Sequence, residues 1–283
     1  MGFAFFVHTQ NKLASGKIMP TIITLLTDFG EHGYYVAALK AQVLRECPQA
    51  HIVDISHRVK SGDLAEAAFL LSAAYQEFPE DTVHLVAVGS ASHPNRRFVA
   101  MKYQGHYFVG PDNGVLTLYT GKEVPAVVAL PDLGEGESNT FPSKRVLAKA
   151  AAQLSNASPL SALGSRLEEW EWEKKHVPVI KDSEDQLRGQ VVFVDQYGNL
   201  VTNIHREEFE RVGRGRRYEV RCAYERFHQL ATYYNSRDFG DCVLLFNSLG
   251  LLEIAINQGN ASELLGMARQ SPVMVRFMNE PSS

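Results

Sequence analysis

The sequence is poor in the features that mark disulfide-rich, membrane-spanning and nucleic-acid-binding proteins. Three cysteines are spread over 283 residues without a CxxC pair, which argues against a disulfide framework and a zinc site. No apolar run reaches the roughly 18 residues that a transmembrane helix needs. Lys and Arg form no block and the formal net charge is −4, a pattern that disfavours nucleic acid and anionic membranes as partners. We therefore expect a cytoplasmic protein with no nucleic-acid or membrane partner.

Common cofactor and catalytic motifs are also missing. The chain contains no GxGxxG, GxxxxGK or GxSxG pattern, which argues against the usual nucleotide-binding loops and the serine-hydrolase elbow. Its ten histidines occur without HxH or HExxH spacing. We expect no metal ion and no bound cofactor, and the candidate residues are instead polar side chains at the ends of strands.

The first half of the sequence alternates between strand and helix patterns. Hydrophobic patterning predicts strands at 21–26, 50–55 and 82–88, helices at 34–47, 63–75 and 147–154, and a hairpin over 97–103 and 106–109. Within the first helix, Val36, Leu39, Val43 and Leu44 are expected on one apolar face. This order of elements is typical of a mostly parallel sheet with helices on its faces.

The sequence changes in character near residue 165. The charged segment EEWEWEKK and a polar stretch precede a second half in which short apolar runs alternate with Gly and Asn turns. Strands are predicted there at 190–195, 200–204, 217–223, 228–232, 242–247, 251–257 and 272–277, which fits a small antiparallel barrel or sandwich. We expect a loose extension at 1–19, an α/β domain at 20–168, a linker at 169–188 and a β-domain at 189–283.

Asp28 is the first candidate binding residue. It directly follows a buried strand, in the sequence TDFG, and open α/β sheets bind ligands at the carboxyl ends of their strands. The same position suits an N-cap of the next helix, a role that Asp performs well. Both interpretations stay open from these residues alone.

Two polar clusters in the second half are the next candidates. Asp195 and Asn199 follow a strand in DQYGN, and Glu253 lies inside the apolar run of NSLGLLEIAI. A buried Glu253 needs a cation nearby, whereas strand alternation also allows this side chain to face solvent.

Six motifs follow one another between about residues 21 and 267, and they read LLTDFG, IVDISH, AAFLLSAAYQEFPEDTVHLVAV, VGPDNGVLT, VVFVDQYGNLVTNI and NSLGLLEIAINQGNASELLG. In this order they resemble the S-adenosylmethionine hydroxide adenosyltransferases. These are S-adenosylmethionine hydrolases, similar in fold to the fluorinases and chlorinases. The resemblance implies an α/β domain followed by a β-barrel, and a homotrimer that binds the small-molecule ligand S-adenosylmethionine at its subunit interfaces.

The resemblance also assigns roles to residues of the first domain. It implies that Asp28 binds the ribose hydroxyls of the ligand. Phe141, with Thr140 beside it, matches a position in the wall of the pocket. Ser92 and Ser143 align with hydroxyls that contact halide in the fluorinase.

In the second domain the resemblance concerns five residues. Asp195 and Asn199 match the pair that holds the methionine and adenine side of the ligand. Ser248 and Glu253 match positions that hold the methionine carboxylate and ammonium, which would provide the cation that a buried Glu253 needs. Tyr233 stands where an aromatic ring stacks on adenine.

The sequence departs from the family pattern at the residues that hold the nucleophile. In the hydrolases an Asp, an Arg and a His position a water or hydroxide that displaces the sulfonium at C5′ of the ribose. Gly89 stands in place of that Asp and Pro142 in place of that His, so only Arg96 is kept. His93 is a candidate local base, and Gly33 replaces a further Asp that follows TDFG.

Three functions therefore remain open. The protein hydrolyses S-adenosylmethionine to adenosine and methionine, more weakly than its relatives; or it binds this or another adenosine compound without turnover; or it transfers the adenosyl group to another nucleophile such as halide. Positioned acid–base groups typically contribute about 10²–10⁴-fold in rate each, so the loss of two of them predicts slow hydrolysis.

Overall fold

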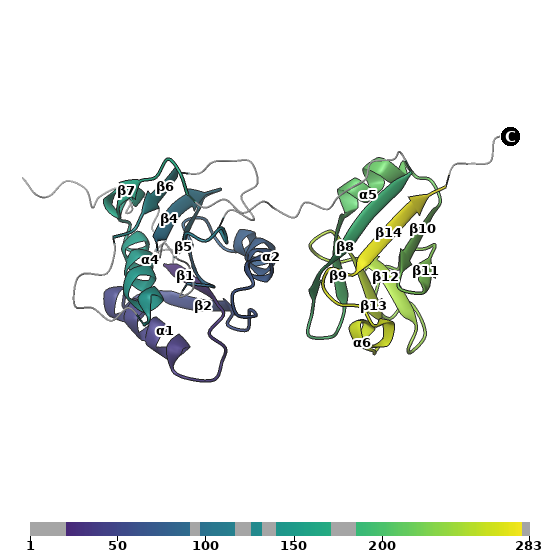
Figure 1. Cartoon of the computed structure of the whole chain (residues 1–283), viewed down its shortest axis with the longest axis horizontal. Helices are drawn as coiled ribbons and strands as arrows, with labels where there is room; N and C mark the ends of the chain where they lie inside the picture. Colours follow the sequence, from purple (N-terminus) through teal and green to yellow (C-terminus); the bar gives the residue numbers. More distant parts are fainter. Residues whose placement is uncertain (1–20, 91–96, 117–125, 132–139, 171–184, 279–283) are drawn as a thin grey trace, which may run out of the picture. The chain divides into compact units, whose positions relative to one another are not determined.

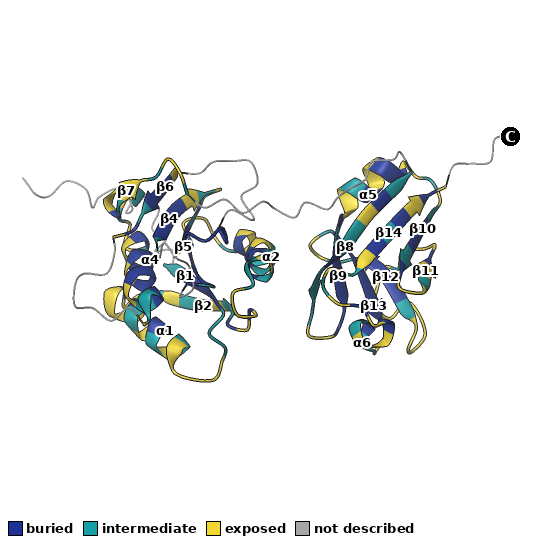
Figure 2. Cartoon of the chain, viewed as in Figure 1, coloured by how far each residue is buried: buried dark blue, intermediate teal, exposed yellow. Residues whose placement is uncertain are grey.

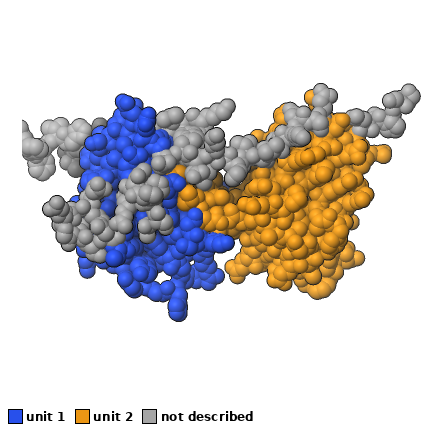
Figure 3. Space-filling view, in the orientation of Figure 1, with its two compact units in different colours: residues 1–62, 77–113, 123–170 blue, residues 63–76, 114–122, 171–283 orange. Residues whose placement is uncertain are grey.

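The computed structural model describes residues 21–90, 97–116, 126–131, 140–170 and 185–278 (Figure 1). The chain divides into two compact units (Figure 3). Unit 1 comprises residues 1–62, 77–113 and 123–170, and unit 2 comprises residues 63–76, 114–122 and 171–283. The extension expected at 1–19 and most of the linker expected at 169–188 lie outside the described residues.

Unit 1 is built on a seven-stranded sheet with the order β2-β1-β3-β5-β4-β6-β7. Its strands are β1 (Ile22–Thr27), β2 (His51–Ser56), β3 (Val83–Ala87), β4 (Phe98–Tyr103), β5 (His106–Pro111), β6 (Ala126–Ala129) and β7 (Ser165–Arg166). The pairs β1–β2, β1–β3 and β3–β5 are parallel, and β4 and β5 form an antiparallel hairpin. The predicted parallel sheet and the predicted hairpin are thus confirmed.

Two helices contribute to the core of unit 1. They are α1 (Tyr35–Glu46) and α4 (Ala148–Ser155), which follows the π-helical turn η2 (Ser143–Leu147). Leu39 and Val43 of α1 are buried in the same core as Ile23 and Leu25 of β1. Figure 2 colours the described residues by burial. Leu44, which the sequence predicts on the same apolar face, is 43% exposed, so the buried stripe of α1 is narrower than expected.

Two histidines are buried side by side in the sheet of unit 1. His84 of β3 is fully buried, with Nδ1 2.7 Å from Thr24 Oγ1 and Nε2 3.3 Å from His106 Nδ1. Burial first, and then the charge of His106, lower the pKa of His84 to about 3, and burial also lowers the pKa of His106. Both imidazoles are therefore neutral in the folded protein near neutral pH.

We expect this pair to make the protein unstable in acid. The unfolded chain protonates His84 near pH 6.5, whereas the folded chain does so only at about pH 3. The stability that the neutral His84 contributes is therefore complete above about pH 6.5 and is lost as the pH falls toward 3. At pH 5 the loss is about 2 kcal/mol. Urea unfolding at pH 7 and pH 5 measures this loss. His84→Asn keeps a polar partner for Thr24 and should show a smaller difference; an unchanged difference would contradict the assignment to His84.

Unit 2 contains a seven-stranded antiparallel sheet that curves into a nearly closed barrel, with the order β11-β10-β14-β8-β9-β13-β12. Its strands are β8 (Gln186–Val194), β9 (Leu200–His205), β10 (Tyr218–Cys222), β11 (Glu225–Phe227), β12 (Cys242–Phe246), β13 (Leu251–Ile256) and β14 (Pro272–Phe277). The predicted antiparallel barrel is confirmed. The strand predicted at 228–232 is wrong, because the chain pairs with β10 earlier, through β11.

The described part of unit 2 also contains three helices. They are α2 (Leu64–Ala74), α5 (Arg206–Gly213) and α6 (Ala261–Leu265). Asp63 is the N-cap of α2, and its side chain accepts a hydrogen bond from Glu66 N at 3.0 Å. Asp63 also pairs with Arg269, and Phe69 of α2 stacks on Phe193 of β8 with ring centroids 4.9 Å apart. Among the described residues, no helix is both long and apolar enough to cross a membrane.

Candidate functional site

Asp28 lies where β1 ends, and its carboxylate binds the backbone of two other loops. Oδ2 accepts hydrogen bonds from Gly62 N at 2.9 Å and from Gly89 N at 3.0 Å. Helix α1 begins only at Tyr35 and has no capping side chain, so the interpretation of Asp28 as its cap is wrong. Within the described part of the chain, Oδ1 accepts no hydrogen bond.

An aromatic cluster adjoins Asp28 in unit 1. The ring of Phe29 lies 5.4 Å from that of Phe141, and Phe141 lies 5.2 Å from Tyr35, measured between ring centroids. Tyr35 in turn stacks on the exposed Tyr34 at 4.5 Å. Phe141 is thus in contact with the residue that follows Asp28, whereas Thr140 is exposed. These rings offer an apolar surface beside the carboxylate.

Two buried serines connect the segments in which the nucleophile-holding residues are replaced. Ser143 Oγ donates a hydrogen bond to Ser90 Oγ at 2.8 Å, and both side chains are buried. Ser90 directly follows Gly89, and Ser143 directly follows Pro142. Because one hydroxyl of such a pair donates to the other, the second proton is available for a bound water or ligand. Sequence reasoning identified Ser143 but missed Ser90, whose partner is remote in the chain.

The segment between Ser90 and Arg97 carries three of the predicted residues. Ser92, His93 and Arg96 lie outside the described residues. At the end of this segment, Arg97 Nε donates to the buried Asp112 Oδ2 at 2.6 Å.

In unit 2, Asp195 and Asn199 lie together at the end of β8. Asp195 Oδ1 accepts hydrogen bonds from Tyr197 N and Asn199 N, both at 2.9 Å, and Oδ2 accepts from Asn199 Nδ2 at 3.0 Å. The intervening Gly198 has a φ of 82°, and a Cβ there would lie 2.0 Å from Asn260 Oδ1. The pair is therefore held in one geometry by its own turn.

Glu253 is a buried carboxyl in the barrel. Its side chain is 3% exposed, because β13 lies between β9 and β12 and all six of its residues are buried. The interpretation of Glu253 as a solvent-facing residue is therefore wrong. Tyr234 Oη donates to Oε1 and Asn247 Nδ2 donates to Oε2, each at 2.9 Å.

Burial and a nearby negative charge raise the pKa of the Glu253 carboxyl. Burial raises the pKa of Glu253, as does the charge of Asp195, against the opposing effect of its two hydrogen bonds. The pKa of Tyr234 is raised mainly by burial, and further by Glu253 and Asp195. Asp195, Tyr234 and Glu253 therefore form one electrostatically coupled cluster, in which a bound cation would be stabilised.

Two further predicted residues extend from this cluster. Asn247 Oδ1 accepts hydrogen bonds from Leu249 N at 3.0 Å and Leu251 N at 3.1 Å, and the resulting turn presents Ser248 to solvent. Tyr233 is 67% exposed and precedes Tyr234. Sequence reasoning missed Tyr234 as a partner of Glu253, although it adjoins the predicted aromatic residue.

Among the described residues, no group of three His, Cys, Asp or Glu side chains is arranged to hold a metal ion.

Comparison with known proteins finds related sequences over nearly the whole chain. Residues 23–164 match the SAM hydroxide adenosyltransferase N-terminal domain, and residues 189–274 match the C-terminal domain of the same family. The chain is 32% identical over 266 residues to the (R)-S-adenosyl-L-methionine hydrolase of Thermus thermophilus, which covers 89% of this chain and 98% of that protein. It is 28% identical over 275 residues to the fluorinase of Nocardia brasiliensis, covering 83% and 90% of the two chains.

Solved structures agree with this similarity. The crystal structure of an uncharacterized conserved protein from Thermotoga maritima matches with a TM-score of 0.80 and 31% identity, covering 90% of this chain and 99% of that one. A conserved hypothetical protein from Thermus thermophilus matches with a TM-score of 0.69 and 30% identity.

Proposed function

The chain belongs to the SAM hydroxide adenosyltransferase family, and from this premise we propose that it binds S-adenosylmethionine and hydrolyses it to adenosine and methionine. The observation that carries the proposal is the geometry of Asp28. Two backbone N–H groups hold Oδ2, while Oδ1 accepts no hydrogen bond within the described residues. A carboxylate fixed in this way suits a pair of neighbouring hydroxyl groups, such as those of a ribose.

The reaction is displacement of the sulfonium at C5′ of the ribose. Because the sulfonium is a good leaving group without protonation, the protein must only align a water about 3 Å from the carbon and exclude other water. In this proposal Asp28 binds the ribose hydroxyls, and Phe141 forms a wall of the pocket. Asp195 and Asn199 are assigned to the methionine and adenine side of the ligand.

The remaining ligand groups and the assembly complete the proposal. Tyr233 is assigned to adenine, and Ser248 and Glu253 to the methionine carboxylate and ammonium. We also propose a cytoplasmic homotrimer with its sites at subunit interfaces, for which light scattering coupled to gel filtration is the test.

The nucleophile is held by fewer groups than in a complete Asp–Arg–His set. Gly89 and Pro142 provide no acid–base side chain. The nucleophilic water is therefore positioned by Arg96, with His93 as local base, and by the Ser90–Ser143 pair. The same replacements favour a second candidate function, in which the protein binds S-adenosylmethionine without turnover. Transfer of the adenosyl group to halide is a third, supported by the related fluorinases.

Incubation of the purified protein with S-adenosylmethionine separates these functions. We expect adenosine and methionine to form in equal amounts, faster than without protein but slowly, because two positioning groups of about 10²–10⁴-fold each are missing. Chromatography detects both products, and isothermal calorimetry measures binding. Binding without products would favour the non-catalytic function, and a halide-dependent product would favour adenosyl transfer. If neither binding nor products appear, the proposed site is wrong.

A further inference from the structure

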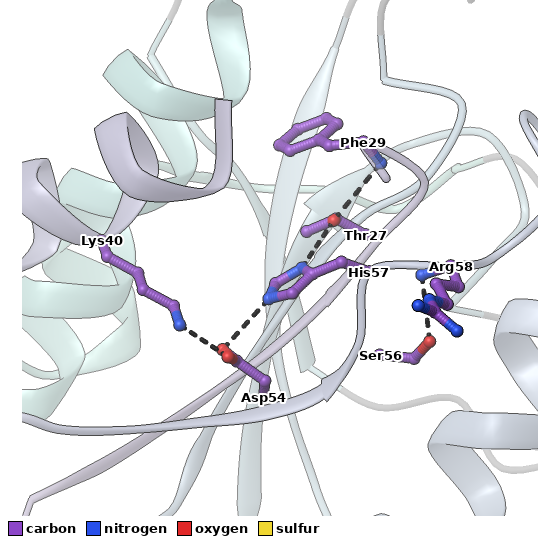
Figure 4. A network of polar contacts seen from close by, with 7 residues as sticks. All are labelled: Thr27, Phe29, Lys40, Asp54, Ser56, His57 and Arg58. Carbon is purple, nitrogen blue, oxygen red and sulfur yellow. Dashed lines mark hydrogen bonds and ion pairs between the residues drawn. The ribbon is translucent and has the colours of Figure 1, made fainter. Parts of the chain in front are cut away.

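A chain of polar contacts in unit 1 begins at Thr27, the residue before Asp28, and runs through His57 and Asp54 to Lys40 (Figure 4). Thr27 Oγ1 lies 2.9 Å from His57 Nδ1, and His57 Nε2 lies 3.1 Å from Asp54 Oδ1. Lys40 Nζ donates to the other oxygen of Asp54 at 2.5 Å. We propose that His57 is a positioning residue that holds the turn carrying Asp28 and so directs the Asp28 carboxylate toward the ligand. The inference rests on the proposed function, in which Asp28 contacts the ligand.

The charge on Asp54 indicates which nitrogen of His57 carries the proton. Partial burial acts to raise the pKa of Asp54, but the contacts with Lys40 and His57 outweigh it and lower the pKa below its ordinary value. Asp54 is therefore ionised, and a carboxylate 3.1 Å from Nε2 favours the proton on that nitrogen, although the contact has ion-pair rather than hydrogen-bond geometry. Nδ1 is then an acceptor, and the Thr27 hydroxyl donates to it.

His57 holds the turn on both sides of Asp28. On one side it fixes the Thr27 hydroxyl, whose oxygen is 3.4 Å from Phe29 N. On the other side its backbone oxygen accepts a hydrogen bond from Gly30 N at 2.8 Å. The backbone before and after Asp28 is thus tied to one residue of the loop after β2. The contacts from Gly62 N and Gly89 N then fix the carboxylate itself.

The burial of Thr27 and His57 indicates that they position Asp28 and do not themselves react with a ligand. An Asp–His–hydroxyl sequence also occurs in nucleophilic triads, where the hydroxyl must reach the substrate. Thr27 is 0% exposed and His57 is 7% exposed, so neither presents its polar atoms to a ligand. Their influence on a bound molecule must pass through the Asp28 turn.

The same strand contains a matched control. Thr24 Oγ1 lies 2.7 Å from His84 Nδ1, in a similarly buried pair that is joined to β1 three residues before Thr27. Thr24→Val and Thr27→Val each remove one buried contact between a hydroxyl and an imidazole from β1. A general loss of stability should therefore appear in both variants, whereas a loss of positioning should appear only in Thr27→Val.

Two substitutions of His57 separate its contacts. His57→Asn places an amide oxygen near the position of Nδ1 and keeps an acceptor for Thr27. His57→Gln places its amide near the position of Nε2 and loses that acceptor. Thr27→Ser keeps the hydroxyl and serves as the conservative partner of Thr27→Val.

The experiment measures S-adenosylmethionine affinity by calorimetry and amide deuterium exchange of residues 28–33 by mass spectrometry. We expect His57→Gln and Thr27→Val to bind about tenfold more weakly and to exchange faster in this segment. His57→Asn, Thr27→Ser and Thr24→Val should stay within about twofold of the unsubstituted protein in affinity and match its exchange.

Three results overturn the inference. They are unchanged affinity in His57→Gln and Thr27→Val, an equal loss of affinity in Thr24→Val, and unchanged exchange of residues 28–33 in all variants. If the unsubstituted protein binds no S-adenosylmethionine, the proposed function fails, and the exchange measurement alone then decides whether His57 holds the turn.

Discussion

Replacing Asp28 with Ala is expected to weaken S-adenosylmethionine binding about 100-fold. Hydrogen bonds to a charged group contribute about 1.5–3 kcal/mol each, and a ribose offers two hydroxyl donors to one carboxylate. Calorimetry of the purified variant measures the change in dissociation constant. Affinity equal to that of the unsubstituted protein would remove Asp28 from the ligand contact.

The alanine variant also loses the contacts with Gly62 N and Gly89 N, so a second variant is needed to separate the two roles of Asp28. Asp28→Asn retains one oxygen for these backbone donors but replaces Oδ1 with an amide that donates. We expect its thermal midpoint to stay close to that of the unsubstituted protein while binding remains weak. Restored binding in Asp28→Asn would show that Asp28 acts only by holding the two loops.

Replacing Glu253 with Ala is expected to lower the free energy of unfolding by about 3 kcal/mol. The substitution leaves the hydroxyl of Tyr234 and the amide of Asn247 without their shared acceptor, and each such loss costs about 1–3 kcal/mol. Urea unfolding measures the difference. A loss below about 1 kcal/mol would contradict the view that Glu253 joins these two loops.

Glu253→Gln is the matched control, because its amide can accept from Asn247 and donate to Tyr234. We expect it to recover most of the lost stability but to bind S-adenosylmethionine about tenfold more weakly, since the ligand ammonium loses its carboxylate. Unchanged affinity would exclude an ammonium contact at Glu253.

The free energy of unfolding of Glu253→Gln and that of the unsubstituted protein should depend differently on pH. Because burial raises the folded pKa of Glu253, its stabilising contribution is present below the unfolded value near 4.3 and is lost as the pH rises through the folded pKa. The stability of Glu253→Gln relative to the unsubstituted protein should therefore increase from acid toward neutral pH.

Much of the fold could be predicted because the relevant signals are local. The apolar run that forms β1 and the pair of runs that form β4 and β5 are each complete within a few residues, and their periodicity indicates a strand whatever the rest of the chain does. Helix α5 was not predicted, since only Phe209, Val212 and Gly213 of its eight residues are buried and the other five are charged. The strand expected at 228–232 failed because pairing with β10 decides where the neighbouring strand lies.

The candidate site shows where local signals end. The sequence alone indicated that Asp28 follows a buried strand, that Asp195 and Asn199 follow another, and that Glu253 lies in an apolar run. It did not determine whether Asp28 caps a helix or whether Glu253 faces solvent. Tertiary structure decided both questions, because the partners of Asp28 are 34 and 61 residues away and the burial of Glu253 depends on the strands on either side of β13.

The same reason explains why His57 and Ser90 were missed as site residues. Each lies in a motif or loop that the sequence made visible, but their partners Thr27 and Ser143 are 30 and 53 residues away. Hydrogen bonds of this span leave no periodic trace in the chain, whereas the strands and helices that bring the partners together do. The sequence thus indicated the elements and the chemistry they carry, and the packing of the sheet decided which backbone groups hold Asp28.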